Sequence, residues 1–231
     1  MPDVNARRPY SSPLRERQAT TTRRAVLEAA RQLFIAQGYG ATTVEQIAQR
    51  AGVSKPTVFS AVGSKQMVLR AVRDTAIAGD DAPVPVARRP ATDRIRAEPD
   101  QRRAVQLLAQ HLTGVASRYA QINEVLHAAA DSGDEDLREL WRTEEDQRLT
   151  GARFWVDVLT RKGPLRPGLR RDDAVDMMWL LMSPDNYYRL VHQRRWTSGK
   201  YQRWLTDSIT ELLAGSRLER SAANHPPRVT N

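Results

Sequence analysis

Hydrophobic residues recur at three- and four-residue intervals along most of this chain, which is the spacing of an amphipathic helix. The first such segment carries on one face Val26, Leu27, Ala30, Leu33 and Phe34. Hydroxyls at residues 20–22 are able to cap the start of this helix, and Gly38 is expected to end it. Because no stretch alternates convincingly between apolar and polar positions, the sequence predicts an all-α protein.

Two short helices are predicted next. Thr43 begins the first of them, because Gln46 three positions later completes a capping box, and Gly52 ends it. Ser54 is expected to cap the following helix, where Pro56 is tolerated in the first turn. Two short helices joined this tightly describe a helix-turn-helix.

The remainder of the chain is predicted to be a helix, a linker and a larger helical part. A helix is expected from Lys65 to about Ile77, and four prolines between residues 79 and 100 exclude a continuous helix there. Further helices are predicted at residues 101–120, 122–130, 135–161, 173–194 and 200–213. The predicted organisation is a flexible basic arm at 1–19, a helix-turn-helix domain at 20–78, a linker or mobile loop at 79–100, a helical domain at 101–216 and a disordered tail at 217–231.

Charge adds a class of partner to this picture. The chain has 231 residues and a formal net charge of +9. Residues 1–75 hold 12 Lys and Arg against 5 Asp and Glu, whereas the remainder holds 24 against 22. Basic charge concentrated in this way favours a polyanion, because neutralising phosphates releases counterions. For the arm two interpretations stay open, namely insertion into a DNA minor groove or a solvated tail without a specific role.

Composition also argues against several classes of protein. The chain has no cysteine, which excludes disulfides and thiol catalysis. Its longest wholly apolar run, Met177 to Met182, is far shorter than the roughly 18 to 20 residues that span a bilayer, so a cytoplasmic protein without a membrane partner is expected. We find no Gly-rich phosphate loop, no GxSxG, no HExxH and no metal-like spacing among the four histidines, so neither an enzyme nor a cofactor is expected.

Several groups of residues between positions 26 and 72 carry a more specific signal. They are Leu33, Phe34 and Gly38; Thr43, Ile47 and Ala48; Ala51, Gly52, Val53 and Ser54; Thr57 and Val58; and Gly63, Ser64 and Lys65. In order and spacing they resemble the DNA-binding head of the TetR family of transcriptional regulators, and the match extends in outline over most of the chain. The resemblance implies a small helix-turn-helix head followed by a larger helical body that binds a ligand and dimerises.

The second helix of such a motif lies in the major groove, where its first turns reach base edges or phosphates. The predicted DNA-contacting residues are Thr43, Ser54, Lys55, Pro56, Thr57, Phe59, Ser60 and Lys65. The resemblance implies that Thr43 and Lys65 clamp the DNA backbone, while capping alone is the structural alternative for Thr43 and Ser54. The family commonly has Tyr-x-His/Tyr-Phe where this chain has residues 59–62 as Phe-Ser-Ala-Val. Two customary phosphate contacts are therefore missing, and affinity would rely more on the lysines and the arm.

The resemblance implies two further surfaces in the body. The last two long helices would pair with a second subunit through Val175, Met178, Trp179, Met182, Leu190, Trp204, Leu205, Ile209 and Leu212. The same residues could equally be ordinary core. Candidate residues for a small-molecule pocket are His111, Tyr119, His127, Trp141, Glu144, Arg148 and Trp155. An ion pair of Glu144 with Arg148 on a solvated flank is the alternative for that pair.

The sequence therefore predicts a homodimeric regulator that binds an inverted-repeat operator in double-stranded DNA. The resemblance implies that an effector bound in the body moves the helix beginning at Lys65 and changes the distance between the two heads. The expected outcome is relief of repression, with activation as the alternative. Two alternatives remain: a helical nucleic-acid-binding or scaffold protein without an effector response, and, less favoured, an enzyme.

Overall fold

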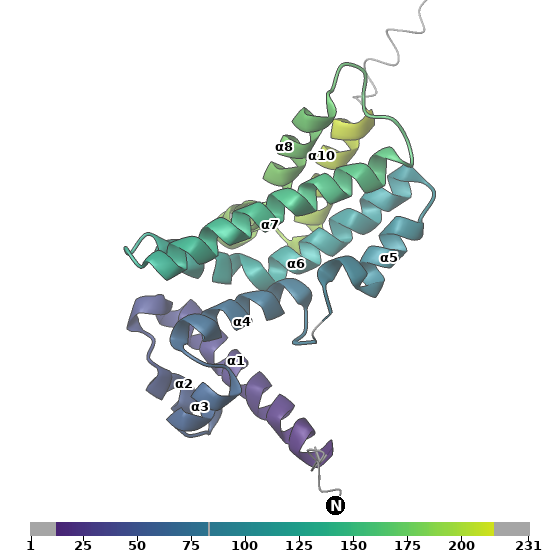
Figure 1. The fold of residues 1–231 in the computed structure, drawn as a ribbon. Coiled ribbons are helices and arrows are strands. Elements are labelled where there is room, and N and C mark those ends of the chain that lie inside the picture. Colours follow the sequence, from purple (N-terminus) through teal and green to yellow (C-terminus); the bar gives the residue numbers. More distant parts are fainter. Residues whose placement is uncertain (1–12, 83, 215–231) are drawn as a thin grey trace, which may run out of the picture. The chain divides into compact units, whose positions relative to one another are not determined.

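The computed structural model describes residues 13–82 and 84–214, and every regular element within these residues is helical (Figure 1). The chain divides into two compact units at residues 1–74 and 75–231, and we call their described parts the head and the body. The prediction of an all-α fold is confirmed. The predicted tail and residues 1–12 of the predicted arm lie outside the described residues.

The head contains three helices and most of a fourth. These are α1 (Pro13–Ala41), α2 (Val44–Ala51), α3 (Lys55–Ala61) and α4 (Lys65–Ala78), of which α4 ends in the body. The side chains of Phe34, Ile47 and Val58 come from α1, α2 and α3 and have 0% exposure. Each of these helices therefore buries one face in a shared core, as the spacing of their apolar residues predicts.

The start of α1 differs from the prediction. The helix begins at Pro13 rather than at residues 20–22, so the part of the predicted arm from 13 to 19 is helical. Thr20 and Thr21 do not cap it; their hydroxyls donate to the carbonyls of Glu16 and Arg17, one turn earlier, at 2.9 Å each. Hydroxyls of this type can satisfy either role, and only the conformation of the preceding residues decides between them.

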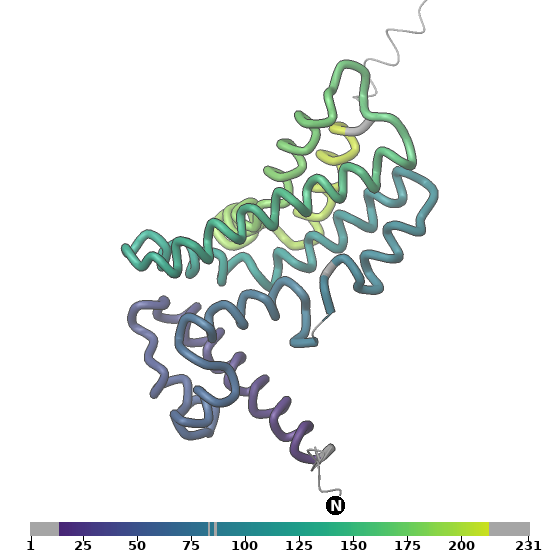
Figure 2. The backbone as a smooth tube through the Cα atoms, viewed as in Figure 1, coloured from purple at the N-terminus to yellow at the C-terminus, as the bar shows by residue number. Residues whose placement is uncertain are grey.

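The body consists of helices of very different lengths (Figures 1 and 2). They are η1 (Val86–Arg88), α5 (Pro90–Ala97), α6 (Gln101–Ala130), α7 (Glu135–Thr160), α8 (Arg171–Leu181), α9 (Pro184–Tyr187), the π-helical turn η2 (Tyr188–Gln193) and α10 (Ser198–Ala214). α6 packs against α7 and α10, and α8 packs against α7. The most deeply buried side chains of this core include Leu108, Ala152, Leu159, Met178, Leu205 and Ile209.

The body helices differ from the predicted ones in three places. The segment 79–100 is not without structure, since Pro90 lies in the first turn of α5, a position that needs no N–H donor. The helices predicted at 101–120 and 122–130 are one continuous helix, α6. The helix predicted at 173–194 is interrupted, because Ser183 accepts a hydrogen bond from the backbone N–H of Asp185 at 3.3 Å and Pro184 begins a new helix.

Among the described residues, none of the helices combines the length and the apolar character needed to cross a bilayer.

Candidate nucleic-acid interface

The turn between α2 and α3 has the local bonds that the sequence predicts. The Thr43 hydroxyl accepts from the backbone N–H of Gln46 at 3.2 Å, and Gln46 Oε1 accepts from the backbone N–H of Thr43 at 2.8 Å, which completes the capping box. Gly52 adopts the left-handed conformation with φ 69° and ends α2. Ser54 caps α3 by accepting from the backbone N–H of Thr57 at 3.3 Å.

One face of α3 is buried and the other is open. Val58 lies in the core with 0% exposure, whereas Phe59 is 47% exposed. The predicted DNA-contacting residues Ser54, Lys55, Pro56, Phe59 and Ser60 are all exposed, and Thr57 is half-buried. The helix that would enter a major groove therefore presents most of its predicted contact residues to the outside of the head.

Lys55 is held in an ion pair within the head. Its ammonium group donates to Glu45 on α2, and both side chains are largely exposed. The pKa of Glu45 is lowered, first because its carboxylate accepts this hydrogen bond. The carboxylate therefore stays ionised at neutral pH, and a DNA phosphate that contacts Lys55 has to replace it.

Lys65 has a structural role that the sequence did not reveal. Its Nζ donates to the carbonyl oxygens of Tyr39 and Thr42 at 3.0 Å each, and it lies 4.1 Å from the centroid of the Tyr39 ring. These bonds hold the end of α1, so the ammonium group is already engaged within the head. Contact of Lys65 with phosphate stays a prediction. No local pattern announces a bond between residues 26 positions apart, which is why sequence reasoning missed it.

Arg23 was likewise absent from the predicted site. Its Nη1 donates to the carbonyl oxygen of Ala61, the last residue of α3, at 3.0 Å. The bond joins α1 to the end of the helix that carries the predicted base contacts. Arg23 therefore helps to position α3, although nothing in its sequence surroundings indicates this role.

The predicted pocket residues fall into separate groups in the body. His111 lies beside Trp155, with ring centroids 6.1 Å apart, and burial lowers the pKa of His111. His127 stacks on Trp141, with ring centroids 4.7 Å apart and an interplanar angle of 25°. Tyr119 is buried in α6. A common pocket for all of these residues stays a prediction.

Arg148 lies between α7 and α8 rather than on the surface of the body. Arg148 forms an ion pair with Glu145, and its side chain is only 11% exposed, so it does not lie on a solvated flank. A pair of Glu144 with Arg148 stays a prediction. Its Nη1 donates to the Trp179 carbonyl at 3.2 Å, and its guanidinium lies 4.4 Å from the centroid of the Trp179 ring. Glu144 is itself buried, with 6% exposure. Arg148 therefore joins α7 to α8.

The residues proposed for dimerisation fall into two groups that differ in burial. Val175, Met178, Leu205, Ile209 and Leu212 are buried in the core of the body. Trp179, Met182, Leu190 and Trp204 are partly buried against that core. The first five are therefore used within one chain, because α8 and α10 pack on α7 and α6. The apolar side chains that α8 does expose are Met177 and Leu180, at 41% and 58%.

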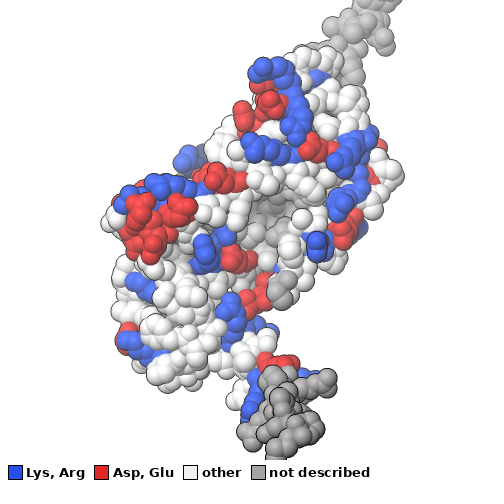
Figure 3. Space-filling view, viewed as in Figure 1, with Lys and Arg blue, Asp and Glu red and all other residues white. Residues whose placement is uncertain are grey.

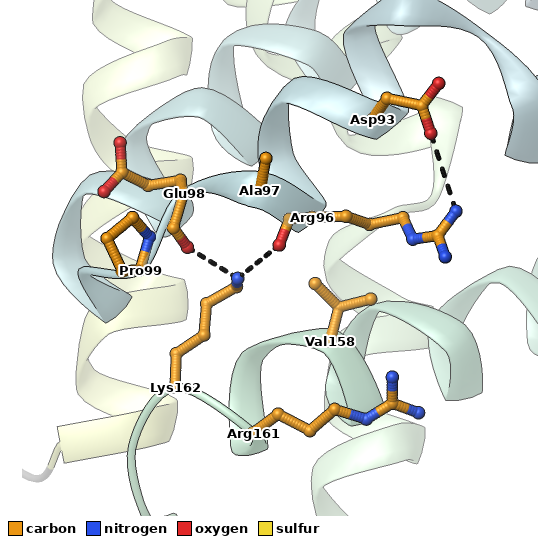
Figure 4. Close-up of a pocket in the computed structure, with 8 residues that line it drawn as sticks. All are labelled: Asp93, Arg96, Ala97, Glu98, Pro99, Val158, Arg161 and Lys162. Carbon is orange, nitrogen blue, oxygen red and sulfur yellow. Dashed lines mark hydrogen bonds and ion pairs between the residues drawn. The ribbon is translucent and has the colours of Figure 1, made fainter.

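A surface cleft of about 690 Å³ lies elsewhere in the body (Figure 4). It is lined by Asp93, Arg96, Ala97, Glu98, Pro99, Val158, Arg161 and Lys162, none of which was a predicted pocket residue. Lys162 donates to the carbonyls of Arg96 and Glu98 at 2.8 and 2.6 Å, and Arg96 pairs with Asp93. Lys162 therefore holds the end of α5 close to the end of α7.

Carboxylates gather where α6 is joined to α7 (Figure 3). Asp134 caps α7 by accepting from the backbone N–H groups of Asp136 and Leu137 at 3.1 and 3.3 Å. Glu135 forms ion pairs with Arg138 and Arg142. These contacts give the cluster a structural role at the start of α7, where negative charge complements the helix dipole. Among the described residues there is no group of three or more side chains suited to hold a metal ion.

Comparison with known proteins agrees with this architecture. Residues 26–72 match the family model of the bacterial regulatory proteins of the tetR family. The chain is 31% identical over 163 residues to the HTH-type transcriptional regulator YdeS of Bacillus subtilis, and the match covers 68% of this chain and 74% of the relative. The relatives are regulators rather than enzymes.

Two solved structures share the fold. The secondary repressor NalD of Pseudomonas aeruginosa has a TM-score of 0.60 and 19% identity, with 86% of this chain and 98% of NalD covered. A protein of Saccharomonospora viridis described as a transcriptional regulator, in complex with choline, has a TM-score of 0.60 and 18% identity, with 83% and 96% covered. The open face of α3, the family match over the head and the shared fold of the body lead to one conclusion: this chain belongs to the TetR family of DNA-binding transcriptional regulators.

Proposed function

We propose that the protein is a homodimeric repressor that binds an inverted-repeat operator and releases it when a small molecule binds the body. The observation that carries this proposal is the exposed face of α3, whose opposite face holds Val58 in the core. One short helix reads too few base pairs for useful specificity, and two heads on symmetric half-sites solve this problem. Such a protein works beside the chromosome, which would place it in the cytoplasm.

Direct contacts to DNA would come from the start of α3 and the residues around it. Thr57 and Ser60 offer hydroxyls to bases or phosphates, and Pro56 and Phe59 offer apolar surface to a thymine methyl group. Lys55 would exchange its bond to Glu45 for a phosphate or a guanine acceptor. The carboxylate left behind would then repel the DNA. Binding by this head is therefore expected to be sensitive to the charge at residue 45.

The dimer surface is best assigned to the outside of α8. Met177 and Leu180 are among the few large apolar side chains of the body that are exposed, and they lie three positions apart on one helix. Trp179 and Trp204, predicted earlier for this surface, are partly buried and could extend it. Burying such residues against a second copy removes apolar area from water.

An effector site in the body is supported by its polar and aromatic side chains. His111 is kept neutral at pH 7 by burial and lies against Trp155, which together offer an aromatic surface and a hydrogen-bonding nitrogen. The regulator of Saccharomonospora viridis that shares the fold was obtained with choline, and NalD is a repressor of a multidrug efflux pump. We therefore propose a small organic effector for this chain.

Selection of bound duplexes from a random pool, followed by gel-shift titration, tests the proposal. The full-length protein is expected to select an inverted repeat, and Lys55→Ala and Thr57→Ala should each weaken its binding about 10-fold or more, since one good contact to a base contributes roughly 1–3 kcal/mol. Arg102→Ala removes a positive charge from an exposed site on α6 and is the matched control. Equal affinity for every duplex would end the proposal.

A further inference from the structure

The last turn of α4, which belongs to the body, ends in carbonyl groups that its own helix does not satisfy. The backbone N–H of Gly79 donates to the Thr75 carbonyl at 2.8 Å. The carbonyls of Ala76 and Ile77 instead accept from Arg118 of α6, from Nε at 3.0 Å and from Nη2 at 3.4 Å. Because α4 has no basic residue in its last turn, the positive charge that complements its dipole comes from another helix.

Two glycines lie next to the Arg118 side chain. Gly79 has a φ of +91°, and a Cβ at this position would lie 3.4 Å from Nη2 of Arg118. Gly114 lies one turn before Arg118 on α6, and a Cβ there would lie 3.6 Å from Nη1. The guanidinium group therefore lies in contact distance of both glycines, and at Gly79 the left-handed φ disfavours any other residue.

A second arginine holds the segment that leaves α4. Arg89 donates to both carboxylate oxygens of Asp80, at 2.8 and 3.0 Å, and to the carbonyls of Ala82 and Val84 at 3.3 and 3.2 Å. This fork of hydrogen bonds lowers the pKa of Asp80, which keeps the carboxylate charged. Burial and the nearby charge of Arg89 lower the pKa of Arg118, and the negative charge of Asp80 acts in the opposite direction. The segment after α4 is thus folded around charged groups rather than left open.

We infer that Arg118 is a positioning residue that fastens the end of α4 to α6 and thereby restricts how the body can influence the head. α4 is unbroken from Lys65 to Ala78, so a group that holds its last turn acts on the whole helix. His111 lies two turns before Arg118 on the same helix, next to Trp155. A ligand that displaces α6 at these rings would displace Arg118 as well. The inference rests on the proposed function, which it deepens by naming the residue that transmits the signal.

The test compares full-length wild-type protein with Arg118→Ala on two measurements. The first is affinity for the selected operator, for versions with the half-sites one or two base pairs closer or farther apart, and for a single half-site. The second is hydrogen–deuterium exchange of the peptide that covers the end of α4. In Arg118→Ala, the ratio of the affinity for the selected operator to that for operators of altered spacing is expected to fall about 10-fold, while the affinity for a single half-site is unchanged. Hydrogen–deuterium exchange at the end of α4 is expected to be about 10-fold faster than in wild type.

Three further variants keep the test decisive. Arg102→Ala removes the same charge from an exposed site on α6 and should behave as wild type. Arg118→Lys keeps the charge but loses the fork and should give an intermediate result. Gly79→Ala strains the left-handed turn that follows α4 and so disturbs the carbonyls that Arg118 binds. It should therefore act in the same direction as Arg118→Ala, and it decides the question if Arg118→Ala does not fold.

The outcomes separate the inference from the proposed function. Wild-type spacing discrimination and wild-type exchange in Arg118→Ala would overturn the inference and leave the operator intact. A wild-type protein that prefers no sequence would end the proposed function, while faster exchange in Arg118→Ala would still support the contact with α4. Loss of half-site affinity in Arg118→Ala would show that Arg118 acts on DNA binding itself and would also overturn the inference.

Discussion

The head and the body are both helical, but their sequences reveal different amounts about them. In the head, α2 and α3 are short, begin at capping hydroxyls and bury one face each. In the body, α8 and α10 carry apolar residues that suit either their own core or a second subunit. Five of the nine residues predicted for the dimer surface lie in the core. An apolar stripe therefore predicts that one face of a helix is buried. Whether that face packs in the chain's own core or against a second subunit depends on the neighbouring helices.

The ends of helices show a second difference within the molecule. Helix starts in both regions are capped by residues two or three positions away, as at Thr43, Ser54 and Asp134. Several helix ends are held from far away in the sequence, as α3 is by Arg23 and α5 is by Lys162. Acceptors for the free N–H groups at helix starts come from short side chains that act locally, whereas long cationic side chains can donate to carbonyls at the end of another helix.

The largest expected effect tests whether the two regions are independent. Phe34 has 0% exposure in the head, and Phe34→Ala should reduce the free energy of unfolding of the head by about 3–5 kcal/mol. All five tryptophans lie in the body, so their fluorescence reports the body alone. In chemical denaturation, Phe34→Ala should therefore shift the circular-dichroism transition of the head to lower denaturant concentration and leave the fluorescence transition of the body unchanged. Leu108→Ala is the matched body variant and should move the fluorescence transition. Equal shifts of both signals in Phe34→Ala would show that the two units unfold together.

An intermediate effect tests which face of α8 is free. Leu180→Glu places a charge at a site that is 58% exposed, so the chain should still fold, while the dissociation constant of the dimer should rise about 10-fold or more. Sedimentation velocity over a range of protein concentrations measures this change. Gln110→Glu adds the same charge to an exposed site on α6 and should leave the dimer unchanged. If Leu180→Glu dimerises like wild type, α8 does not form the interface.

The smallest expected effect concerns local capping in the head. Thr43→Ala removes the hydroxyl that accepts from Gln46, and should lower the free energy of unfolding of the head by about 1 kcal/mol. Thr43→Ser retains the cap and should lie close to wild type in the same denaturation experiment. If Thr43→Ala lowers operator affinity while the stability of the head is unchanged, Thr43 contacts phosphate rather than serving as a cap alone.

The sequence by itself determined the helical class, the capped starts of α2 and α3, the left-handed glycine between them and the family of the protein. These features depend on residues a few positions apart, whose preferences act before any long-range contact forms. Tertiary structure alone decided that Lys65 bonds to the end of α1, that Arg148 pairs with Glu145 and reaches Trp179, and that α6 runs without a break. Some of these contacts join residues far apart in the chain, and others involve one of several equivalent neighbours. The sequence does not determine them, because local preferences allow several partners and only tertiary packing selects one.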